Sequence, residues 1–508
     1  MGLPGRLLDI WMVAAEVGPL AQTGGLADVL RALPAALARQ GHRVRVFLPA
    51  YGRIDKSPFA SLPREDHLAV PLGIGRVPVR FLTRPAADGV VTTLAQNEEL
   101  FGRDNLYGPH TGGDFPDNAR RFALLARAVV ELAARSDRPP DVLHGHDWHV
   151  GLMPLLARLA GAWRGRRPKT VHTIHNMGYQ GHFGGDEMDW ITRNTALRET
   201  LFRLDGIEFR GGINFLKAAI QFADRLTAVS PRYAWEITTL EGGFGLHDAA
   251  WRRRGDLAGI LNGADYEQWD PRHDPNIPER YDSGSIGRKE ASRKFLRAAF
   301  GLAPAGPAVT PGSAAPSGPG AADRPILGVV SRLVDQKGID VLLEAAPALL
   351  RAGAALVVLG AGNGRIAGGL ERLRREHPDQ VGLYIGFNEP LSHLILAGSD
   401  LLLVPSRYEP CGLVQMHAMR YGTIPVVHRT GGLADTVRDE TAEPERGTGF
   451  VFEGLGAGTL AEAVHRALIL RSGSPGRWRA LQERAMAEDF SWDRSAARYA
   501  EVYESALG

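Results

Sequence analysis

Short apolar segments alternate with longer amphipathic segments along most of the chain. Residues 7–15 and 44–48 are strand-like, and residues 26–40 between them carry Leu and Ala at helical spacing. This order predicts a strand–helix–strand unit, which builds a parallel sheet with a right-handed crossover. Further strands are predicted at residues 90–94, 142–143, 170–174, 226–229 and 257–261, with helices at 122–134, 215–223 and 231–239.

A second alternating series follows in the other half of the chain. Its predicted strands are residues 326–330, 355–359, 381–385, 401–404, 424–427 and 449–452. Two such series predict an α/β protein with two doubly wound domains. The expected division is an N-terminal domain (1–264), a crossing with a helix and an insertion (265–325), a C-terminal domain (326–488) and a last helix (489–508).

The insertion and the last helix have distinct compositions. Residues 303–325 are mostly Ala, Pro, Gly and Ser, which predicts a flexible surface segment without a core. The last helix carries one apolar stripe, and an apolar stripe needs a neighbour to bury it. We therefore expect this helix to cross back to the first domain. The stripe consists of Trp492, Ala496, Tyr499, Val502 and Tyr503.

Composition and charge narrow the class of protein. The 508 residues are 44% hydrophobic and 23% charged, with a formal net charge of +2. Without a basic field, nucleic acid is not expected as a partner. The single Cys411 fits a reducing compartment. The apolar residues 7–17 contain Asp9 and Glu16, and no segment has the roughly 18 uncharged apolar residues of a membrane span. A cytoplasmic protein without membrane contact is predicted.

Gly-rich turns follow several predicted strands. After strand 401–404 come Glu409, a turn at Gly412 and a second turn at Gly432, each opening a predicted helix. The carboxyl ends of parallel strands bind ligands, and helix N-termini there suit phosphate groups. The sequence TGGLAD occurs at residues 430–435 and again at 23–28. This repeat indicates two related turns in two domains, with coincidence in an Ala/Gly-rich chain as the alternative.

Other polar residues also follow strands. Arg332 and Lys337 come after strand 326–330, and two cations beside a helix start fit a diphosphate. His144, His146 and His149 follow strand 142–143, and His175 follows strand 170–174. These histidines are compatible with a metal site, with hydrogen bonding to a polar substrate, or with packing. We favour hydrogen bonding, because His-x-His places at most two ligands on one face and no further ligand set is visible.

Three weaker signals lie in the second half. The turn at residues 360–365 (GAGNGR) has Arg365 where a dinucleotide fingerprint needs its third Gly, which favours a plain turn. Cys411 lies in a Pro/Gly turn, where a packed side chain is favoured over a nucleophile. Phe387 follows strand 381–385 and is compatible with stacking on a purine or with core packing.

In order, the segments TGGLADVLRALP, HGHDWHVGL, TIHNMGYQG, ILNGAD, VSRLVDQKG, PSRYEPCGL and RTGGLADTV resemble those of bacterial glycogen synthases and plant starch synthases. The similarity covers about residues 7–506 apart from the insertion. It implies a GT-B architecture, in which two Rossmann-like domains face a central cleft. It also implies retaining, metal-independent transfer of glucose from ADP-glucose to the non-reducing end of an α-1,4-glucan such as glycogen, without a cofactor. The oligomeric state stays open.

The resemblance also implies roles for individual residues. In the expected catalytic set, Arg332 and Lys337 bind the donor diphosphate. Glu409 binds the glucose hydroxyls, and His175 and Asp147 line the sugar site. The expected donor-binding residues are Gln22, Gly24, Gly25, Asp28, Asn262, Phe387, Cys411, Gly412, Leu413, Thr430 and Gly431. Tyr107, His146 and Trp148 are expected on the acceptor side. Retention by front-face attack and by double displacement both stay open.

One position departs from the family pattern. The first motif of the family usually reads Lys-x-Gly-Gly, and here that position is Gln22. Losing one charge-assisted contact to the donor phosphates costs about 1.5–3 kcal/mol. A non-catalytic or weakly active glucan-binding relative is therefore an alternative to an active synthase. A sister glycosyltransferase that uses another nucleotide sugar is a further alternative, and a nicotinamide dehydrogenase is disfavoured by the missing fingerprint.

Overall fold

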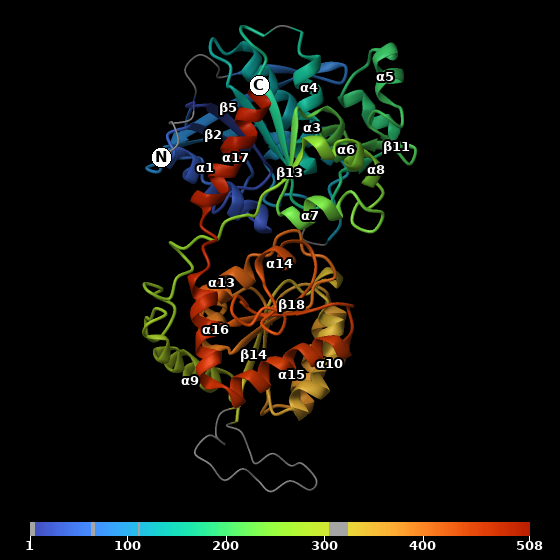
Figure 1. Ribbon diagram of the computed structural model, residues 1–508. Coiled ribbons are helices and arrows are strands. Elements are labelled where there is room, and N and C mark those ends of the chain that lie inside the picture. Colours follow the sequence, from blue (N-terminus) through green and yellow to red (C-terminus); the bar gives the residue numbers. More distant parts are fainter. Residues whose placement is uncertain (1–5, 62–66, 110–111, 162, 304–323) are drawn as a thin grey trace, which may run out of the picture. The chain divides into compact units, whose positions relative to one another are not determined.

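The computed structural model describes residues 6–61, 67–109, 112–161, 163–303 and 324–508. The chain divides into two compact units, one made of Met1–Gly263 with Trp492–Gly508 and the other of Ala264–Ser491 (Figure 1). Most of the insertion expected at residues 303–325 lies outside the described residues. None of the described helices combines the length and apolar character needed to cross a bilayer.

The first unit is built around a mainly parallel sheet. Its parallel strands are ordered β13-β12-β8-β7-β1-β2-β6. They are β1 (Asp9–Val13), β2 (Arg43–Pro49), β6 (Val90–Gln96), β7 (Val142–His146), β8 (Lys169–Ile174), β12 (Arg225–Ala228) and β13 (Leu257–Gly259). Along β1, Trp11 and Val13 enter one hydrophobic core, whereas Ile10 and Met12 enter the other. The sheet is therefore buried on both faces, which explains the continuous apolar runs in the sequence.

An antiparallel extension of this sheet was not predicted. The strands β3 (Ala60–Ser61), β4 (Leu68–Leu72) and β5 (Gly75–Pro85) continue the sheet beyond β6. Pro71 lies in β4 and Pro78 in β5. Proline removes a backbone donor and is tolerated mainly near sheet edges, so these segments did not read as strands.

Helices cover the first unit's sheet, and the segment between β8 and α6 (Phe215–Phe222) forms a small antiparallel sheet. The helices are α1 (Gly25–Arg39), α2 (Glu98–Phe101), α3 (Asn118–Arg135), α4 (Met153–Leu159), α5 (Thr195–Leu201), α6 (Phe215–Phe222), α7 (Pro231–Glu236) and α8 (His247–Arg252). Short 3-10 turns are Trp148–Val150, Gly185–Trp190 and Arg254–Asp256. The small sheet has the order β10 (Glu208–Phe209), β11 (Gly212–Asn214) and β9 (His182–Phe183).

The last helix, α17 (Trp492–Leu507), belongs to the first unit. Trp492, Tyr499 and Tyr503 are buried in the same core as the inner face of α1. The hydroxyl of Tyr503 lies 2.8 Å from Nδ1 of His144 on β7. At the other end of α17, the guanidinium of Arg39 donates to the carboxylate of Asp493. The apolar stripe of this helix is thus buried against the first sheet and α1.

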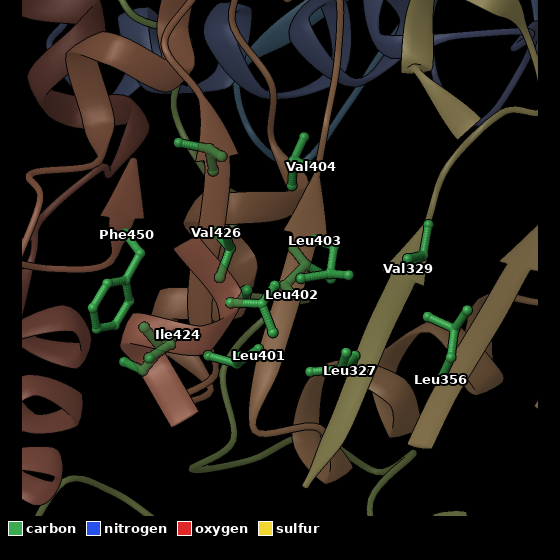
Figure 2. Close-up of a cluster of buried hydrophobic side chains, with 14 of the residues drawn as sticks. Leu327, Val329, Leu356, Leu401, Leu402, Leu403, Val404, Ile424, Val426 and Phe450 are labelled. Atoms are coloured by element: carbon green, nitrogen blue, oxygen red, sulfur yellow. The ribbon is translucent and has the colours of Figure 1, made fainter. Parts of the chain in front are cut away.

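The second unit has a fully parallel sheet with the order β16-β15-β14-β17-β18-β19. These strands are β14 (Ile326–Val330), β15 (Ala355–Gly360), β16 (Val381–Ile385), β17 (Leu401–Val404), β18 (Ile424–His428) and β19 (Phe450–Phe452). Figure 2 shows apolar side chains along β14, β15, β17, β18 and β19, among them Leu327, Leu402 and Val426. On β15, Leu356 and Val358 pack in this core, and the alternate residues pack in a second one.

Helices again separate the strands of the second unit. They are α9 (Lys289–Phe300), α10 (Ile339–Arg351), α11 (Gly364–Glu376), α12 (Glu389–Gly398), α13 (Val414–Arg420), α14 (Gly431–Thr436), α15 (Ala457–Gly473) and α16 (Pro475–Ala487). Two 3-10 turns, Ile286–Arg288 and Asp335–Lys337, precede α9 and α10. The turn before α10 places Lys337 just beyond the carboxyl end of β14, on the edge of the sheet where parallel strands bind ligands.

Candidate active site

Glu409 and Lys337 form an ion pair in the second unit. The Nζ of Lys337 lies 2.5 Å from Oε2 of Glu409, and the hydroxyl of Ser406 donates to the same oxygen at 2.9 Å. The Glu409 side chain is 8% exposed and that of Lys337 is 18% exposed. A charge-assisted bond at low exposure is among the stronger polar contacts in proteins. The carboxylate is therefore held in one place at the carboxyl ends of β14 and β17.

A set of bonds fastens the Glu409 loop (residues 405–413) to the turn before α10. The carbonyl of Gln336 accepts from the backbone N–H of Arg407 at 2.8 Å, and Nε2 of Gln336 donates to the carbonyl of Tyr408 at 3.1 Å. The guanidinium of Arg407 donates two bonds to Asp340, at 2.8 and 2.6 Å. The exposed Arg332 lies 3.5 Å from Oε1 of Gln336. Gln336 thus links the loop of Glu409 to Arg332, which is expected to bind the donor diphosphate.

The Gly turn at residues 430–432 packs directly against the Glu409 loop. Gly431 has a φ of 43°, and a Cβ there would lie 2.0 Å from the carbonyl oxygen of Glu409. The N–H of Gly432 donates to that same oxygen at 3.0 Å. Gly412 has a φ of 72°, and Cys411 is buried. Glycine is required at Gly431 because two backbone segments meet there.

Phe387 lies beyond β16, at the same edge of the second sheet. Its side chain is 82% exposed, so it is not part of a core. The neighbouring Gly386 donates its N–H to the carbonyl of Gly360, at the end of β15. The turn at residues 360–362 meets the segment after β14, where Leu333 donates its N–H to the carbonyl of Ala361 at 2.7 Å. An exposed aromatic ring beside three strand ends offers a stacking surface for a planar ligand.

Asp147 has an unusual backbone and a strongly shifted pKa. It follows β7 in the first unit with a φ of 59°, a region that non-glycine residues rarely adopt. Its carboxylate accepts the backbone N–H of His175 at 2.8 Å and that of Asn176 at 3.3 Å. Burial raises the pKa of Asp147 to about 7, despite these two bonds. Backbone strain and perturbed titration together mark a candidate functional residue.

The first unit's histidines form a mostly buried group. His144 bonds to Tyr503 and Thr173, and Nδ1 of His146 lies 3.0 Å from Nε2 of His175. His146 is fully buried. Its ring supports His175, and the expected contact of His146 with a sugar stays a prediction. Among the described residues, no group of three or more His, Cys, Asp or Glu side chains is arranged to hold a metal ion.

The remaining residues of the first unit that are expected to contact a sugar differ in exposure. Asn262, just after β13, is 6% exposed, and its Oδ1 has no hydrogen-bond partner within the part of the chain that the structure describes. Trp148 is half-buried and stacks on His149 with ring centroids 4.0 Å apart. Tyr107 also stacks on His149, with ring centroids 4.7 Å apart. Tyr107, His149 and Trp148 therefore form a continuous stack.

The first Gly turn is occupied by a side chain of the protein itself. The carboxylate of Glu16 accepts the N–H groups of Thr23 and Gly24, at 2.6 and 3.1 Å. The N–H of Gly24 is thus bonded within the protein, and its expected contact with the donor phosphate stays a prediction. Gly25, which begins α1, has open space where a Cβ would lie. A ligand can approach its backbone closely.

Gln22 lies beside this turn and is exposed. Its Nε2 donates to Oδ1 of Asp28 at 3.1 Å, so the side chain reaches toward the first turn of α1. In this place the amide supplies a hydrogen-bond donor without a charge. The departure from the family pattern is thus located at the N-terminus of α1, where an anion is favoured by the helix dipole.

Comparison with known proteins shows where this chain belongs. The family model described as "Starch synthase catalytic domain" matches residues 9–251, and that described as "Glycosyl transferases group 1" matches residues 316–482. "Glycogen synthase 2" of Geobacter metallireducens is 42% identical over 500 residues, which are 98% of this chain and 99% of the relative. "Glycogen synthase" of Anaeromyxobacter dehalogenans is 43% identical over 515 residues, with 98% and 99% covered. The chain belongs to the glycogen and starch synthase family.

Solved structures agree with this family assignment. The catalytic domain of starch synthase IV from Arabidopsis thaliana, solved with ADP and acarbose, matches with a TM-score of 0.85 and 31% identity over 99% of this chain and 100% of that chain. Sucrose-phosphate synthase from Thermosynechococcus elongatus matches with a TM-score of 0.56 at 20% identity over 98% and 99%, which supports the fold alone. The expected GT-B fold and the resemblance to glycogen synthases are confirmed, and this family member is a glycosyltransferase.

Sequence reasoning missed three residues that hold this family member's candidate site together. They are Glu16 in the first unit, and Ser406 and Gln336 in the second. Ser406 and Gln336 lie within the motifs quoted above. Gln336 bonds to Tyr408, 72 positions away in the chain, and Ser406 bonds to Glu409 within one tight loop. Glu16 offered a signal, because a carboxylate inside an otherwise apolar strand end is expensive to bury without donors.

Proposed function

We propose that this glycosyltransferase transfers glucose from ADP-glucose to the non-reducing end of an α-1,4-glucan, with retention at the anomeric carbon. The observation that carries the proposal is the fixed pair of Lys337 and Glu409 at the strand ends of the second unit, with Arg332 linked to the Glu409 loop through Gln336. Family membership supports the substrates, since starch synthase IV of Arabidopsis thaliana was solved with ADP and acarbose. No metal or other cofactor takes part in the proposal.

The second unit holds the donor. Arg332 and Lys337 bind the diphosphate and neutralise the charge that grows on departing ADP. A preorganised donor of this kind contributes about 3–4 kcal/mol to lowering a barrier. Phe387 stacks on the adenine, which explains an aromatic ring that is 82% exposed. N–H groups from the turns at Gly412 and Leu413 and at Thr430 and Gly431 complete the donor contacts.

The reaction breaks the bond between the anomeric carbon and the phosphate oxygen and forms one to the acceptor's O4. The bonding electron pair leaves with ADP, and the acceptor proton passes to the departing phosphate oxygen. Oε2 of Glu409 is already engaged by Lys337 and Ser406, which suits an electrostatic role toward the oxocarbenium-like centre more than nucleophilic attack. We therefore favour front-face attack over double displacement.

The first unit contributes to sugar recognition. Asp147 accepts hydrogen bonds when ionised, and Oδ1 of Asn262 is a buried acceptor that a sugar hydroxyl satisfies. His175, held by His146, offers a neutral ring. Gln22 replaces a lysine and brings a donor without a charge, so donor use is weaker than in relatives with lysine by roughly ten- to a hundredfold.

The test is the initial rate of glucosyl transfer from labelled ADP-glucose to glycogen, with no metal added. Wild type is compared with Glu409→Ala, Gln22→Lys and a surface control, Glu99→Ala, whose carboxylate pairs with Arg120. We expect transfer by wild type, near-complete loss in Glu409→Ala, faster donor use in Gln22→Lys and no change in the control. The product is analysed for its anomeric configuration.

The other outcomes discriminate between the alternatives. If the wild type shows no transfer activity and Gln22→Lys restores it, the protein is a glucan-binding relative that has lost catalysis at one position. Silence in both with ADP-glucose, but turnover with UDP-glucose, indicates a different nucleotide sugar. Silence with every donor, combined with retained glucan binding, contradicts the proposal.

A further inference from the structure

Glu16 joins two parts of the first unit through one carboxylate. Oε2 accepts the backbone N–H groups of Thr23 and Gly24, at 2.6 and 3.1 Å. Oε1 accepts the hydroxyl of Thr23 at 2.7 Å and the phenol hydroxyl of Tyr107 at 2.6 Å. The whole residue is 5% exposed. All four partners are neutral donors, and both carboxylate oxygens are fully engaged.

The position of Glu16 in the fold explains why it reaches both partners. It follows β1, so its side chain leaves the carboxyl end of the central strand of the sheet. The Gly turn before α1 returns to this strand end, where Gly18 donates its N–H to the carbonyl of Ala27. Tyr107 comes from the segment before α3, where its carbonyl accepts from Phe115 and Asn118. Three separate segments therefore meet on one side chain.

Burying a carboxylate is costly unless its oxygens are satisfied, and hydrogen bonds from backbone N–H groups satisfy it well. Its backbone donors, the N–H groups of Thr23 and Gly24, precede the first residue of α1, so the carboxylate holds the turn rather than capping the helix. The carboxylate also orders the Tyr107 hydroxyl. Both ligand-facing parts, the turn with its open Gly25 and the Tyr107 ring, depend on it for their relative position.

We propose that Glu16 is a positioning residue that fixes the first Gly turn and Tyr107 relative to one another for substrate binding. The inference rests on the proposed function, in which the turn meets the nucleotide sugar and Tyr107 meets the glucan. Glu16 does not touch substrate. It uses up the N–H groups of Thr23 and Gly24 and leaves Gly25, with open space beside it, to face a ligand.

The shape of Glu16 and its charge can be separated by substitution. In Glu16→Gln, the amide oxygen replaces Oε2 and keeps both backbone bonds. The amide nitrogen replaces Oε1 and donates to the two hydroxyls, which can turn round to accept. All four contacts survive without the charge. Glu16→Ala removes all four, and Tyr107→Phe removes one while leaving the turn held. Glu99→Ala, an exposed carboxylate of the same unit, is the control.

The experiment measures the affinities for ADP and for maltoheptaose by calorimetry, the KM for each substrate and kcat, and the thermal midpoint. We expect Glu16→Gln to stay within about threefold of wild type in every value, because hydrogen bonds of unchanged geometry carry the effect. We expect Glu16→Ala to weaken both ligands by roughly tenfold, and Tyr107→Phe to weaken maltoheptaose alone. In the Glu16→Ala background, Tyr107→Phe has little further effect, as for two residues of one network.

Three outcomes overturn the proposal. The first is Glu16→Gln as damaged as Glu16→Ala, which makes the charge itself the functional element. The second is a lower thermal midpoint in Glu16→Ala with unchanged affinities and KM values, which makes Glu16 structural only. The third is full additivity of Glu16→Ala and Tyr107→Phe. A wild type that binds both ligands without transfer overturns the proposed function alone, because the affinities still test Glu16; a wild type that binds neither overturns both.

Discussion

The ammonium group of Lys337 lies 2.5 Å from Oε2 of Glu409, although the two residues are 72 positions apart in the chain. Parallel pairing of β14 with β17 places their carboxyl ends side by side, and each residue follows one of these strands. The pair is therefore a direct product of sheet order. In the proposed function, Lys337 lies between Glu409 and the donor diphosphate, where negative charge grows during transfer.

Replacing Lys337 with Met should lower kcat by roughly 10²–10³-fold, since it removes a preorganised charge aimed at the leaving group. Methionine keeps most of the apolar stem, so the fold should persist. The measurement is the initial rate of glucosyl transfer at saturating substrates, together with the thermal midpoint. Lys294→Met, which removes an exposed lysine on α9, is the matched control and should leave the rate unchanged. A rate within threefold of wild type for Lys337→Met would contradict this role.

Replacing Arg407 with Ala should slow transfer much more than it destabilises the protein. Arg407 and Asp340 are 39% and 49% exposed, and exposed pairs contribute only about 0–1 kcal/mol to stability. The same guanidinium, however, donates to the carbonyl of Asp335 and holds the loop of Glu409. We expect kcat/KM to fall roughly tenfold, as for a misplaced catalytic group.

The control for this prediction removes a comparable exposed pair elsewhere in the second unit. Arg479 pairs with Glu483 on α16, with exposures of 53% and 44%. Arg479→Ala should change neither the rate nor the thermal midpoint appreciably. If Arg407→Ala lowers the thermal midpoint by many degrees and leaves kcat/KM intact, the pair is structural and the prediction fails.

Sequence reasoning succeeded where chemistry and periodicity coincide. Most parallel strands of the two sheets are rich in apolar residues because both sheet faces are buried, and such segments are visible without a structure. Arg332, Lys337 and Glu409 could be placed together because each follows a strand of one parallel sheet. The apolar stripe of α17 likewise predicted that this helix packs against a neighbour, and Tyr503 on the stripe is buried.

It failed where a bond joins segments that no pattern connects. The strands β4 and β5 contain proline, so their pairing depends on neighbours rather than on local preference. The first Gly turn resembles an anion site, yet two of its N–H groups, those of Thr23 and Gly24, are bonded by Glu16, seven and eight residues upstream. His146 belongs to a polar motif and is nevertheless covered, because β7 lies in the middle of the sheet.

The activity should depend on the ionisation of Asp147, whose pKa burial raises to about 7. Below this pH the carboxyl is protonated, and above it the ionised form accepts hydrogen bonds from sugar hydroxyls. We therefore expect kcat/KM to rise through about pH 7 and then level off. Asp147→Asn should flatten this rise and lower the plateau roughly tenfold. Asp248→Asn, an exposed carboxylate on α8, should keep the wild-type profile.

The buried histidines should make the first unit sensitive to acid. Burial lowers the pKa values of His172 and His175 to about 3, and it lowers the pKa values of His144, His146 and His149 well below their usual range. Below pH 6.5 the unfolded chain therefore binds protons that the folded chain does not. Stability is complete above pH 6.5 and falls as the pH drops below it. His172 and His175, with folded pKa values of about 3, each cost about 2 kcal/mol by pH 5, and the other three buried histidines act in the same direction.

Asp147 acts in the opposite direction, because its raised pKa means that the folded state holds a proton between about pH 4 and 7. Acidification from pH 7.5 to 5 therefore returns roughly 2–3 kcal/mol, which offsets about one of these five histidines. The destabilisation by the histidines is larger than the gain from Asp147. Urea unfolding at pH 7.5 and at pH 5 should therefore show that the free energy of unfolding is several kcal/mol lower at pH 5. His172→Phe, which replaces a ring buried without polar partners among the described residues, should reduce that loss by one histidine's share. Equal stability at pH 7.5 and 5 would show that these rings accept protons in the folded state.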